Sequence, residues 1–247
     1  MGWNDDDGGH ALVVGAGGGI GGAMVERWAA DPAVKRVWAV SRSCGRFADR
    51  GDRVVELQAE HSEEGIAATL DTVLADGAGL SRVVVALGTL HSTAYEPEKS
   101  LDALRADVLA EVYRINCILP LLWVAGLGRA LRRSPDTRIA VLSARVGSIA
   151  DNGLGGWYAY RSSKAALNMG LKSAAIELGR RARGIKLLAY HPGTVATALS
   201  APFQKNVPAQ KLFSPAFTAE CLDGLLSTHA PDGELSFVAW DGQTIPW

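Results

Sequence analysis

The sequence predicts an α/β protein built on one doubly wound parallel sheet of about seven strands, with helices on both faces. Short apolar runs alternate with helix-forming segments, and several runs are apolar at every position, as parallel strands covered on two sides are. Crossovers in such a sheet are right-handed, which gives the doubly wound order. No linker, charge block or internal repeat divides the chain. We therefore expect a single domain over residues 10–247, preceded by a flexible tail over residues 1–9.

The individual elements follow from local patterns in chain order. Buried strands are expected where short apolar runs stop at glycine or polar residues, and helices fill the intervals between them. Pro32 ends the first helix and Gly184 ends the longest one. The expected strands are residues 10–15, 37–40, 54–57, 82–86, 138–143, 185–190 and 235–239. The expected helices are residues 19–31, 63–76, 100–113, 115–133, 157–183 and 215–228.

The composition is that of a folded, water-soluble protein. Of 247 residues, 48% are hydrophobic and 21% charged, which excludes a disordered chain. The 25 Lys and Arg against 26 Asp and Glu leave a net charge of −1, so no nucleic-acid partner is expected. No apolar run approaches the ~20 residues of a membrane span, and the acidic N-terminus is unlike a signal peptide. The three Cys and five His lack metal-ligand spacing. We expect no metal, no membrane and a cytoplasmic location.

A glycine-rich loop, residues 15–21, joins the first expected strand to the first helix. Glycine allows a tight turn and a close approach of backbone to phosphate, and the following helix N-terminus attracts an anion. This position between strand and helix favours dinucleotide binding on a Rossmann-type sheet, although a flexible turn is the alternative. The candidate cofactor contacts are Gly15, Gly17, Gly18, Gly19, Ile20 and Gly21.

The end of the second expected strand bears on the choice of cofactor. An acidic residue at this place would hold the adenosine 2′-hydroxyl of NAD(H) and repel a 2′-phosphate. The chain has Ser41 and Arg42 instead. Arg42 can pair with a phosphate and Ser41 can donate to it. The pattern favours NADP(H), with NAD(H) still possible, and an ordinary surface arginine is the alternative.

Tyr160 and Lys164 lie four residues apart in the longest expected helix, so they share one face. A tyrosine hydroxyl has a pKa near ~10, and a neighbouring ammonium group lowers it. Such a pair can exchange a proton with a substrate oxygen while hydride moves to or from carbon. A solvated helix face is the common alternative for this spacing.

The motifs together resemble the short-chain dehydrogenase/reductase family. Gly15-x-x-x-Gly19-Ile-Gly21, Asn116, Ser143, Tyr160-x-x-x-Lys164 and the segment 192–197 occur in the order and approximate spacing of that family, over residues 10–247. Residues 143–152, 155–164, 191–195 and 241–247 look like the bacterial C-factor-like subgroup, which is similar to sniffer-type carbonyl reductases.

The resemblance implies a role for each matching residue. Tyr160 would be the acid/base, and Lys164 would bind the nicotinamide ribose and tune it. Asn116 would hold a helix kink and a water of the proton relay, with local hydrogen bonding as the alternative. Gly88 would let backbone approach the cofactor. The residues closing over the nicotinamide would be Pro192, Gly193, Val195 and Thr197.

Two departures from the family pattern concern the cofactor. The family's Asn-Ala-Gly after the fourth strand is Ala86-Leu87-Gly88 here, which removes one strand-to-strand hydrogen bond. The usual Asp near the adenine is replaced at about Ala59, so adenine binding is looser or Glu60 substitutes.

A third departure concerns the substrate. The fifth strand ends in Ser143-Ala144 where the family often has two serines. Ser143 takes the catalytic role, or Ser148 does, or Tyr160 alone holds the substrate oxygen. Loss of one oxyanion-type donor can lower the rate by ~10²–10³, so the choice matters.

These observations indicate an NADP(H)-dependent oxidoreductase that transfers hydride between nicotinamide and a small carbonyl or alcohol. The alternative is a C-factor-like signalling or dinucleotide-binding protein with little turnover; an isomerase or dehydratase on the same scaffold is a third. The family suggests a homodimer or homotetramer. Residues 199–213 are expected to form an apolar substrate lid. Trp240 and residues 245–247 are expected to dock on the body or on another subunit.

Overall fold

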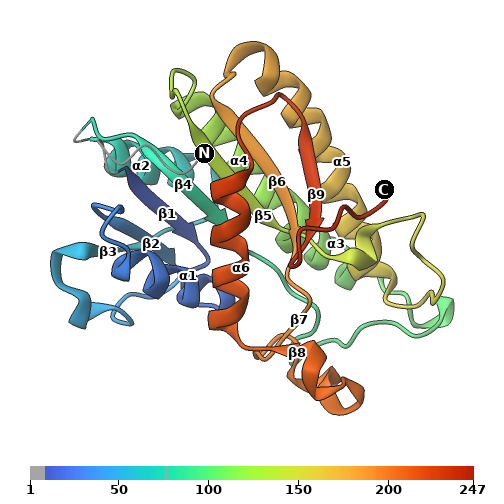
Figure 1. Ribbon diagram of the computed structural model, residues 1–247. Coiled ribbons are helices and arrows are strands. Elements are labelled where there is room, and N and C mark those ends of the chain that lie inside the picture. Colours follow the sequence, from blue (N-terminus) through green and yellow to red (C-terminus); the bar gives the residue numbers. More distant parts are fainter. Residues whose placement is uncertain (1–8, 76) are drawn as a thin grey trace.

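A seven-stranded parallel sheet forms the centre of the computed structural model, which describes residues 9–75 and 77–247 (Figure 1). All but one residue of the expected tail therefore lie outside the described residues. The strands run in the order β3-β2-β1-β4-β5-β6-β9, and every neighbouring pair is parallel. Their bounds are β1 His10–Val14, β2 Val37–Ser41, β3 Val54–Gln58, β4 Leu80–Val85, β5 Thr137–Leu142, β6 Ile185–His191 and β9 Leu235–Ala239. The seven expected strands and the doubly wound α/β class are confirmed.

Helices cover both faces of this sheet because its strands are apolar on both sides. Helices α1 (Gly19–Ala30) and α6 (Pro215–Thr228) pack together on one face (Figure 1). The other face carries α2 (Glu63–Leu74), α4 (Leu119–Ala130) and α5 (Tyr158–Arg181). Each face has its own core, built around Trp28 on the first side and Trp123 on the second, both fully buried.

The strand order reverses beside β1, between β1 and β4, which is where ligands bind in open α/β sheets. The glycine loop follows β1 at this switch point, and Ala86–Gly88 follows β4 beside it. The sheet therefore brings two glycine-containing turns together at its carboxyl edge.

The largest departure from the expected elements lies between β4 and β5. The helix expected from residue 100 begins at residue 106, as α3 (Ala106–Tyr113), after a short 3₁₀ turn (Leu101–Ala103). Leu101 and Leu104 are exposed, so no buried face supports the extra turns of helix. The helix does not break near residue 114; it continues through a π-helical turn (Arg114–Ile118) into α4.

This continuous helical stretch, Ala106–Ala130, is long and apolar enough to pass a length-and-composition test for a membrane span. Its mean hydropathy is 1.5 and 44% of its most apolar window is buried. Core helices pass the same test, and this stretch supplies Trp123 and Leu127 to the core beside the sheet. The sequence predicts no apolar stretch long enough to span a membrane. The structure corrects this, because α3, the π-helical turn and α4 join separate apolar runs into one helix of that length.

Candidate active site

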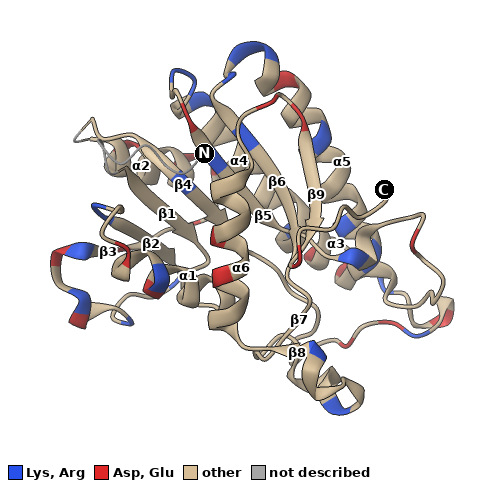
Figure 2. Cartoon of the chain, viewed as in Figure 1, with Lys and Arg blue, Asp and Glu red and all other residues tan. Residues whose placement is uncertain are grey.

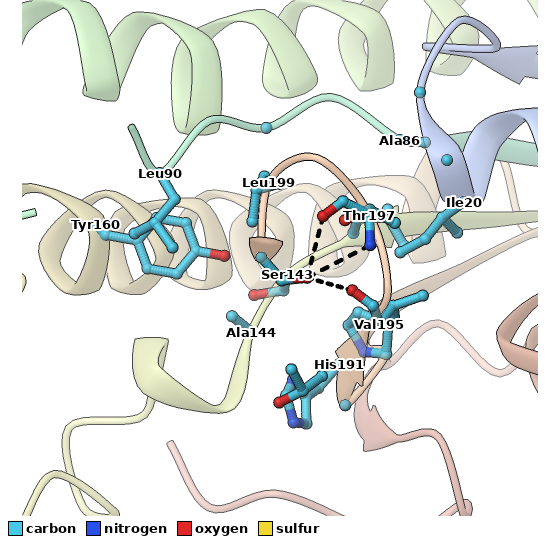
Figure 3. A pocket seen from close by; sticks show the side chains of 18 of the residues that line it. Ile20, Ala86, Leu90, Ser143, Ala144, Tyr160, His191, Val195, Thr197 and Leu199 are labelled. Atoms are coloured by element: carbon cyan, nitrogen blue, oxygen red, sulfur yellow. Dashed lines mark hydrogen bonds between the residues drawn. The ribbon is translucent and has the colours of Figure 1, made fainter. Parts of the chain in front are cut away.

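A cleft of about 440 Å³ opens at the carboxyl edge of the sheet (Figure 3). It is bounded by the glycine loop, the turn after β4, the end of β5, the start of α5 and the segment after β6. Its lining includes most of the predicted site residues: Gly18, Gly19, Ile20, Gly21, Gly88, Ser143, Tyr160, Lys164, Pro192, Gly193, Val195 and Thr197. Chain segments up to about 180 residues apart in sequence thus meet at one place.

The glycine loop is tightly folded on itself. Gly15 has a φ of 89°, which glycine adopts without strain, and its carbonyl oxygen accepts from the Gly18 amide at 3.0 Å. A Cβ on Gly21 would lie 2.3 Å from that same oxygen, so no side chain fits there. Helix α1 begins at Gly19 with no side-chain cap, so its first N–H groups are available to an anion.

Arg46 closes the outer side of this loop, and sequence reasoning missed it. Its Nη1 donates to the carbonyl oxygens of Ala16, Gly17 and Gly18 at 3.2, 2.9 and 3.1 Å. The Glu56 carboxylate on β3 accepts the Arg46 amide at 3.1 Å and thereby fixes the turn that carries it. The sequence contains one signal that could have indicated this role, namely a second arginine four residues after Arg42.

The predicted 2′-phosphate readers are only partly placed as expected. Arg42 is exposed at the end of β2. Burial lowers the pKa of His61, and the charge of Arg42 adds to this effect. The Ser41 hydroxyl donates to the Ser43 carbonyl, so its proton is already used. In this structure Ser41 therefore differs from the expectation that it donates to a ligand, because a local turn satisfies it first.

Helix α5 presents both members of the Tyr–Lys pair to the cleft. Tyr160 directs its hydroxyl end into the cleft (Figure 3), and burial raises its pKa to about 12. Lys164 is 2% exposed and its Nζ donates to the Leu142 carbonyl at 2.7 Å. Burial lowers the pKa of Lys164 to about 8. Tyr160 is therefore protonated at neutral pH, and Lys164 loses its proton at a lower pH than an ordinary lysine does.

Asn116 lies in the π-helical turn and is fully buried. Its Oδ1 accepts from the Thr89 amide at 2.7 Å, and its Nδ2 donates to the Thr89 carbonyl and to Ser163 Oγ at 2.9 and 3.1 Å. The side chain thus ties the turn after β4 to α5. The predicted kink is present as a π turn, whereas the amide is fully engaged with protein groups.

Ser143 and Ala144 directly follow β5, and both line the cleft. The Ser143 hydroxyl donates to Asn168 Oδ1 on α5 at 2.6 Å. Ser148 is 2% exposed, is absent from the described lining and accepts from the Asp151 amide at 3.0 Å. Of the two predicted serines, Ser143 is therefore the one that reaches the cleft.

Residues 196–211, called the lid segment here, lie over the cleft between β7 (Thr194–Val195) and β8 (Leu212–Phe213). Thr197 lies against the glycine loop, since a Cβ on Gly19 would come within 2.5 Å of its methyl carbon. Ser200 Oγ accepts from the Thr197 amide at 3.4 Å (dashed in Figure 3). The lid segment's two charged residues, Lys205 and Lys211, are exposed; the part of the chain that carries them is marked blue next to β8 in Figure 2.

An aromatic wall closes the cleft next to Tyr160. Phe203 of the lid segment lies 5.2 Å from the Trp157 ring, and Trp157 lies 6.2 Å from the Tyr160 ring. His91 contacts the Phe203 ring at 5.8 Å, and its Nε2 lies 3.2 Å from the Ala198 carbonyl oxygen. These contacts hold the lid segment to the body. Trp157 has a φ of 51°, a left-handed conformation in which α5 starts.

Two features of the cleft suit a dinucleotide. A Cβ on Gly88 would stand 3.6 Å from Asn116 Oδ1 and 3.7 Å from Lys164 Nζ, so glycine keeps open a cradle that a side chain would fill. No Asp or Glu occurs among the described lining residues, which suits an anionic ligand. His191 also lines the cleft, and burial lowers its pKa to about 4. No cluster of metal-binding side chains is found within residues 9–75 and 77–247.

Backbone hydrogen bonds hold both positions at which the chain departs from the family pattern on the cofactor side. The Ala86 amide donates to the Val14 carbonyl at 2.7 Å, which joins β1 to the turn after β4 without the usual asparagine. The Ala59 amide donates to the Ser41 carbonyl at 3.2 Å and extends the β2–β3 pairing. Glu60 is exposed.

The C-terminal residues dock on the body, as expected. Ile245 is 1% exposed and its amide donates to the Phe237 carbonyl at 2.9 Å. Trp247 stacks on Phe237 at 5.4 Å, and Trp240 packs 4.5 Å from Phe213 of β8.

A parallel sheet with a glycine loop at its switch point, facing a Tyr–Lys pair across one cleft, defines a Rossmann-type dehydrogenase architecture. Comparison with known proteins agrees with this class: the short chain dehydrogenase family model matches residues 9–208. The chain belongs to the short-chain dehydrogenase/reductase family.

Three similar proteins illustrate the relationship. The C-signal protein of Myxococcus xanthus is 34% identical over 175 residues, which cover 71% of this chain and 92% of that protein. A short-chain dehydrogenase/reductase from Burkholderia multivorans, solved with bound NADP, has a TM-score of 0.78 at 25% identity and covers 97% of this chain and 99% of that one. The carbonyl reductase Sniffer of D. melanogaster has a TM-score of 0.81 at 20% identity, with 97% and 99% coverage, and shares the fold.

Proposed function

We propose that the protein is an NADPH-dependent reductase of small, neutral carbonyl compounds, which can also run in reverse as an alcohol dehydrogenase. The observation that carries the proposal is the meeting of Tyr160, Lys164 and the glycine loop in one cleft that lacks carboxylates among its described lining. The NADP-bound relative supports the cofactor class.

Separate groups of residues would bind the cofactor and the substrate. The glycine loop, braced by Arg46, and the first N–H groups of α1 would hold the pyrophosphate. Arg42 would face the adenosine 2′-phosphate, and Lys164 would hold the nicotinamide ribose. When bound in this cleft, NADPH would supply the hydride for reduction.

Tyr160 supplies the proton. Burial raises its pKa to about 12, so at neutral pH it carries the proton that a carbonyl oxygen needs as its negative charge develops. Lys164, once turned from the Leu142 carbonyl toward the ribose, stabilises the phenolate that remains. A protonated tyrosine is the form that reduction of a carbonyl requires.

The aromatic wall indicates the substrate class. Trp157 and Phe203 face the cleft beside Tyr160, and the lid segment adds Leu199 and Val207. Such a lining favours apolar, aromatic carbonyl compounds over charged keto acids.

The test is a titration of the purified protein with NADPH and NADH, followed by a carbonyl panel of benzil, benzaldehyde and pyruvate. We expect tighter binding of NADPH, turnover of the two aromatic compounds, and none of pyruvate. Tyr160→Phe should lower turnover by ~10³-fold or more while cofactor binding stays unchanged. Tyr158→Phe, two residues earlier and outside the described lining, is the matched control.

Two other outcomes would change the conclusion. Cofactor binding without turnover of any carbonyl would favour the second candidate, a dinucleotide-binding protein related to C-signal. Retained turnover in Tyr160→Phe would exclude the proposed proton transfer.

We also propose that the protein is a homodimer or homotetramer. Ile118, Met169 and Ile176 expose apolar side chains next to α4 and on α5, with exposed fractions of 49, 69 and 42%. Light scattering measures the mass directly, and Met169→Glu should dissociate an assembly formed through this face.

A further inference from the structure

The hydrogen bond between Ser143 and Asn168 uses the one proton that a reductase would need from Ser143. Ser143 Oγ lies 2.6 Å from Asn168 Oδ1, and the serine is the donor because an amide oxygen can only accept. Both side chains are buried, with exposed fractions of 4 and 3%. A carbonyl substrate also only accepts, so Ser143 in this arrangement has no proton to give it.

The other half of the Asn168 amide points to a second arrangement. Its Nδ2 is buried and has no hydrogen-bond partner among the described residues. An unpaired buried donor is rarer and less favourable than an under-used acceptor. A half-turn of the amide about the Cβ–Cγ bond brings Nδ2 to Ser143 in the same space. The amide then donates to Ser143 Oγ, and the hydroxyl proton of Ser143 is released toward the cleft.

We infer that Asn168 is a positioning residue whose amide orientation decides whether Ser143 donates to, or accepts from, the oxygen of the substrate. The inference rests on the proposed reductase function. In one orientation Ser143 donates to a carbonyl oxygen, and in the other it accepts from an alcohol hydroxyl. No covalent bond changes; only the direction of one hydrogen bond is reversed.

The fold gives reasons why this control falls to Asn168. Ala144 offers no second hydroxyl, and the Ser148 hydroxyl caps a nearby turn. Asn168 follows Lys164 by one helical turn on α5, behind Ser143, and does not itself line the cleft. It can therefore act on the substrate only through Ser143.

Asn168→Asp tests the inference because it keeps the shape and removes the donor. A carboxylate only accepts, so it fixes the Ser143 proton away from the substrate. With NADPH and the fastest carbonyl of the panel above, kcat is expected to fall about 10²-fold, as for the loss of one oxyanion donor. The dissociation constant of NADPH should not change. Binding of the corresponding alcohol, measured by calorimetry, should be retained because Ser143 can still accept.

Asn168→Leu separates this role from a purely structural one. Leucine neither donates nor accepts, so the Ser143 hydroxyl is free to turn to the substrate. We expect Asn168→Leu to keep kcat within about 10-fold of wild type and to exceed Asn168→Asp. Ser143→Ala should lose as much as Asn168→Asp, and the double variant should lose no more than either.

The variants at Asn168 are compared with a control of the same chemical change elsewhere in the chain. Asn152→Asp is the matched control, because Asn152 is exposed and its Oδ1 accepts from the Gly155 amide at 3.1 Å, a bond that a carboxylate keeps. Thermal unfolding of each variant identifies loss of folding. A kcat for Asn168→Asp within 3-fold of wild type, or a lower kcat for Asn168→Leu than for Asn168→Asp, would overturn the inference. Wild-type protein that reduces no carbonyl would instead overturn the proposed function.

Discussion

Arg46 donates from its guanidinium to the carbonyl oxygen of Gly17 at 2.9 Å, so a side chain from beyond β2 braces the loop that follows β1. The same Nη1 also reaches the carbonyls of Ala16 and Gly18. A positive charge therefore sits on the outer side of the loop that would cradle the phosphates. Arg42, four residues earlier in the chain at the end of β2, is exposed as Arg46 is.

The two arginines are expected to differ in effect. Arg46→Ala loosens the loop itself, so NADPH and NADH should both bind about 10–100-fold more weakly, as for loss of charge-assisted hydrogen bonds. Arg42→Ala should weaken NADPH alone. Fluorescence titration with both cofactors measures this, with Arg50→Ala as the control in the same segment. If Arg46→Ala binds NADPH as tightly as the wild-type protein does, Arg46 has no role in shaping the loop for the cofactor.

The burial of Lys164 leads us to expect that cofactor binding depends on pH. Burial lowers its pKa to about 8 in the free protein, and only the ammonium form can donate all its hydrogen bonds to a ribose. Binding should be independent of pH below about 7 and should weaken as pH rises through 8, because a proton must then be taken up. Lys164→Met should bind weakly at every pH. Lys172→Met, on the exposed side of α5, should behave as wild type.

We expect substitution by alanine to affect cofactor binding at Gly88 and folding stability at Gly21. A Cβ on Gly88 meets Asn116 Oδ1 and Lys164 Nζ at ordinary contact distances, 3.6 and 3.7 Å. Gly88→Ala should therefore fold normally and lose cofactor affinity by 10-fold or more. A Cβ on Gly21 comes within 2.3 Å of the Gly15 oxygen, so Gly21→Ala should lower the melting temperature. Calorimetry of both variants tests this, and normal cofactor affinity in Gly88→Ala would show that the cradle is used otherwise.

Phe203 predicts substrate preference. Removing its ring opens the wall next to Trp157, which lies 5.2 Å away. Phe203→Ala should lower kcat/KM for benzil by about 10–100-fold, because the lost aromatic contact contributes roughly 1.5–3 kcal/mol. The kcat/KM for a small aldehyde should fall less. Phe217→Ala on α6 is the control. Equal losses for both substrates would indicate that Phe203 closes the lid segment rather than selecting the substrate.

Asp31 predicts acid sensitivity of the fold. Burial opposes ionisation of Asp31, but hydrogen bonds from Arg82 at 2.6 Å and from the Ala33 amide outweigh it and lower its pKa below the usual 3.8. A carboxyl with a lowered pKa stabilises the fold above about pH 4 and stops doing so as pH falls below that. Asp31→Asn should cost about 2 kcal/mol at pH 7 and much less at pH 3. Urea unfolding at both values, with exposed Asp71→Asn as control, decides this.

Local patterns in the sequence were sufficient for the sheet and for much of the site. Strands that are apolar on both faces predict a parallel sheet, and the spacing of Tyr160 and Lys164 places both on one side of α5. The glycine loop is recognisable because its function depends on residues adjacent in the chain. Such features depend on periods of two or 3.6 residues and on backbone freedom, which a sequence states directly.

Contacts between distant residues were decided only by the tertiary structure. The sequence could not show that the Ser143 proton is held by Asn168, that Asn116 is engaged with Thr89 and Ser163, or that Arg46 reaches the glycine loop. Each of these pairs joins separate elements, and its geometry depends on how helices and strands pack in three dimensions. The sequence by itself therefore determined the class of fold and the chemical groups of the site. Packing determined which of those groups still have a proton or a charge to offer a ligand.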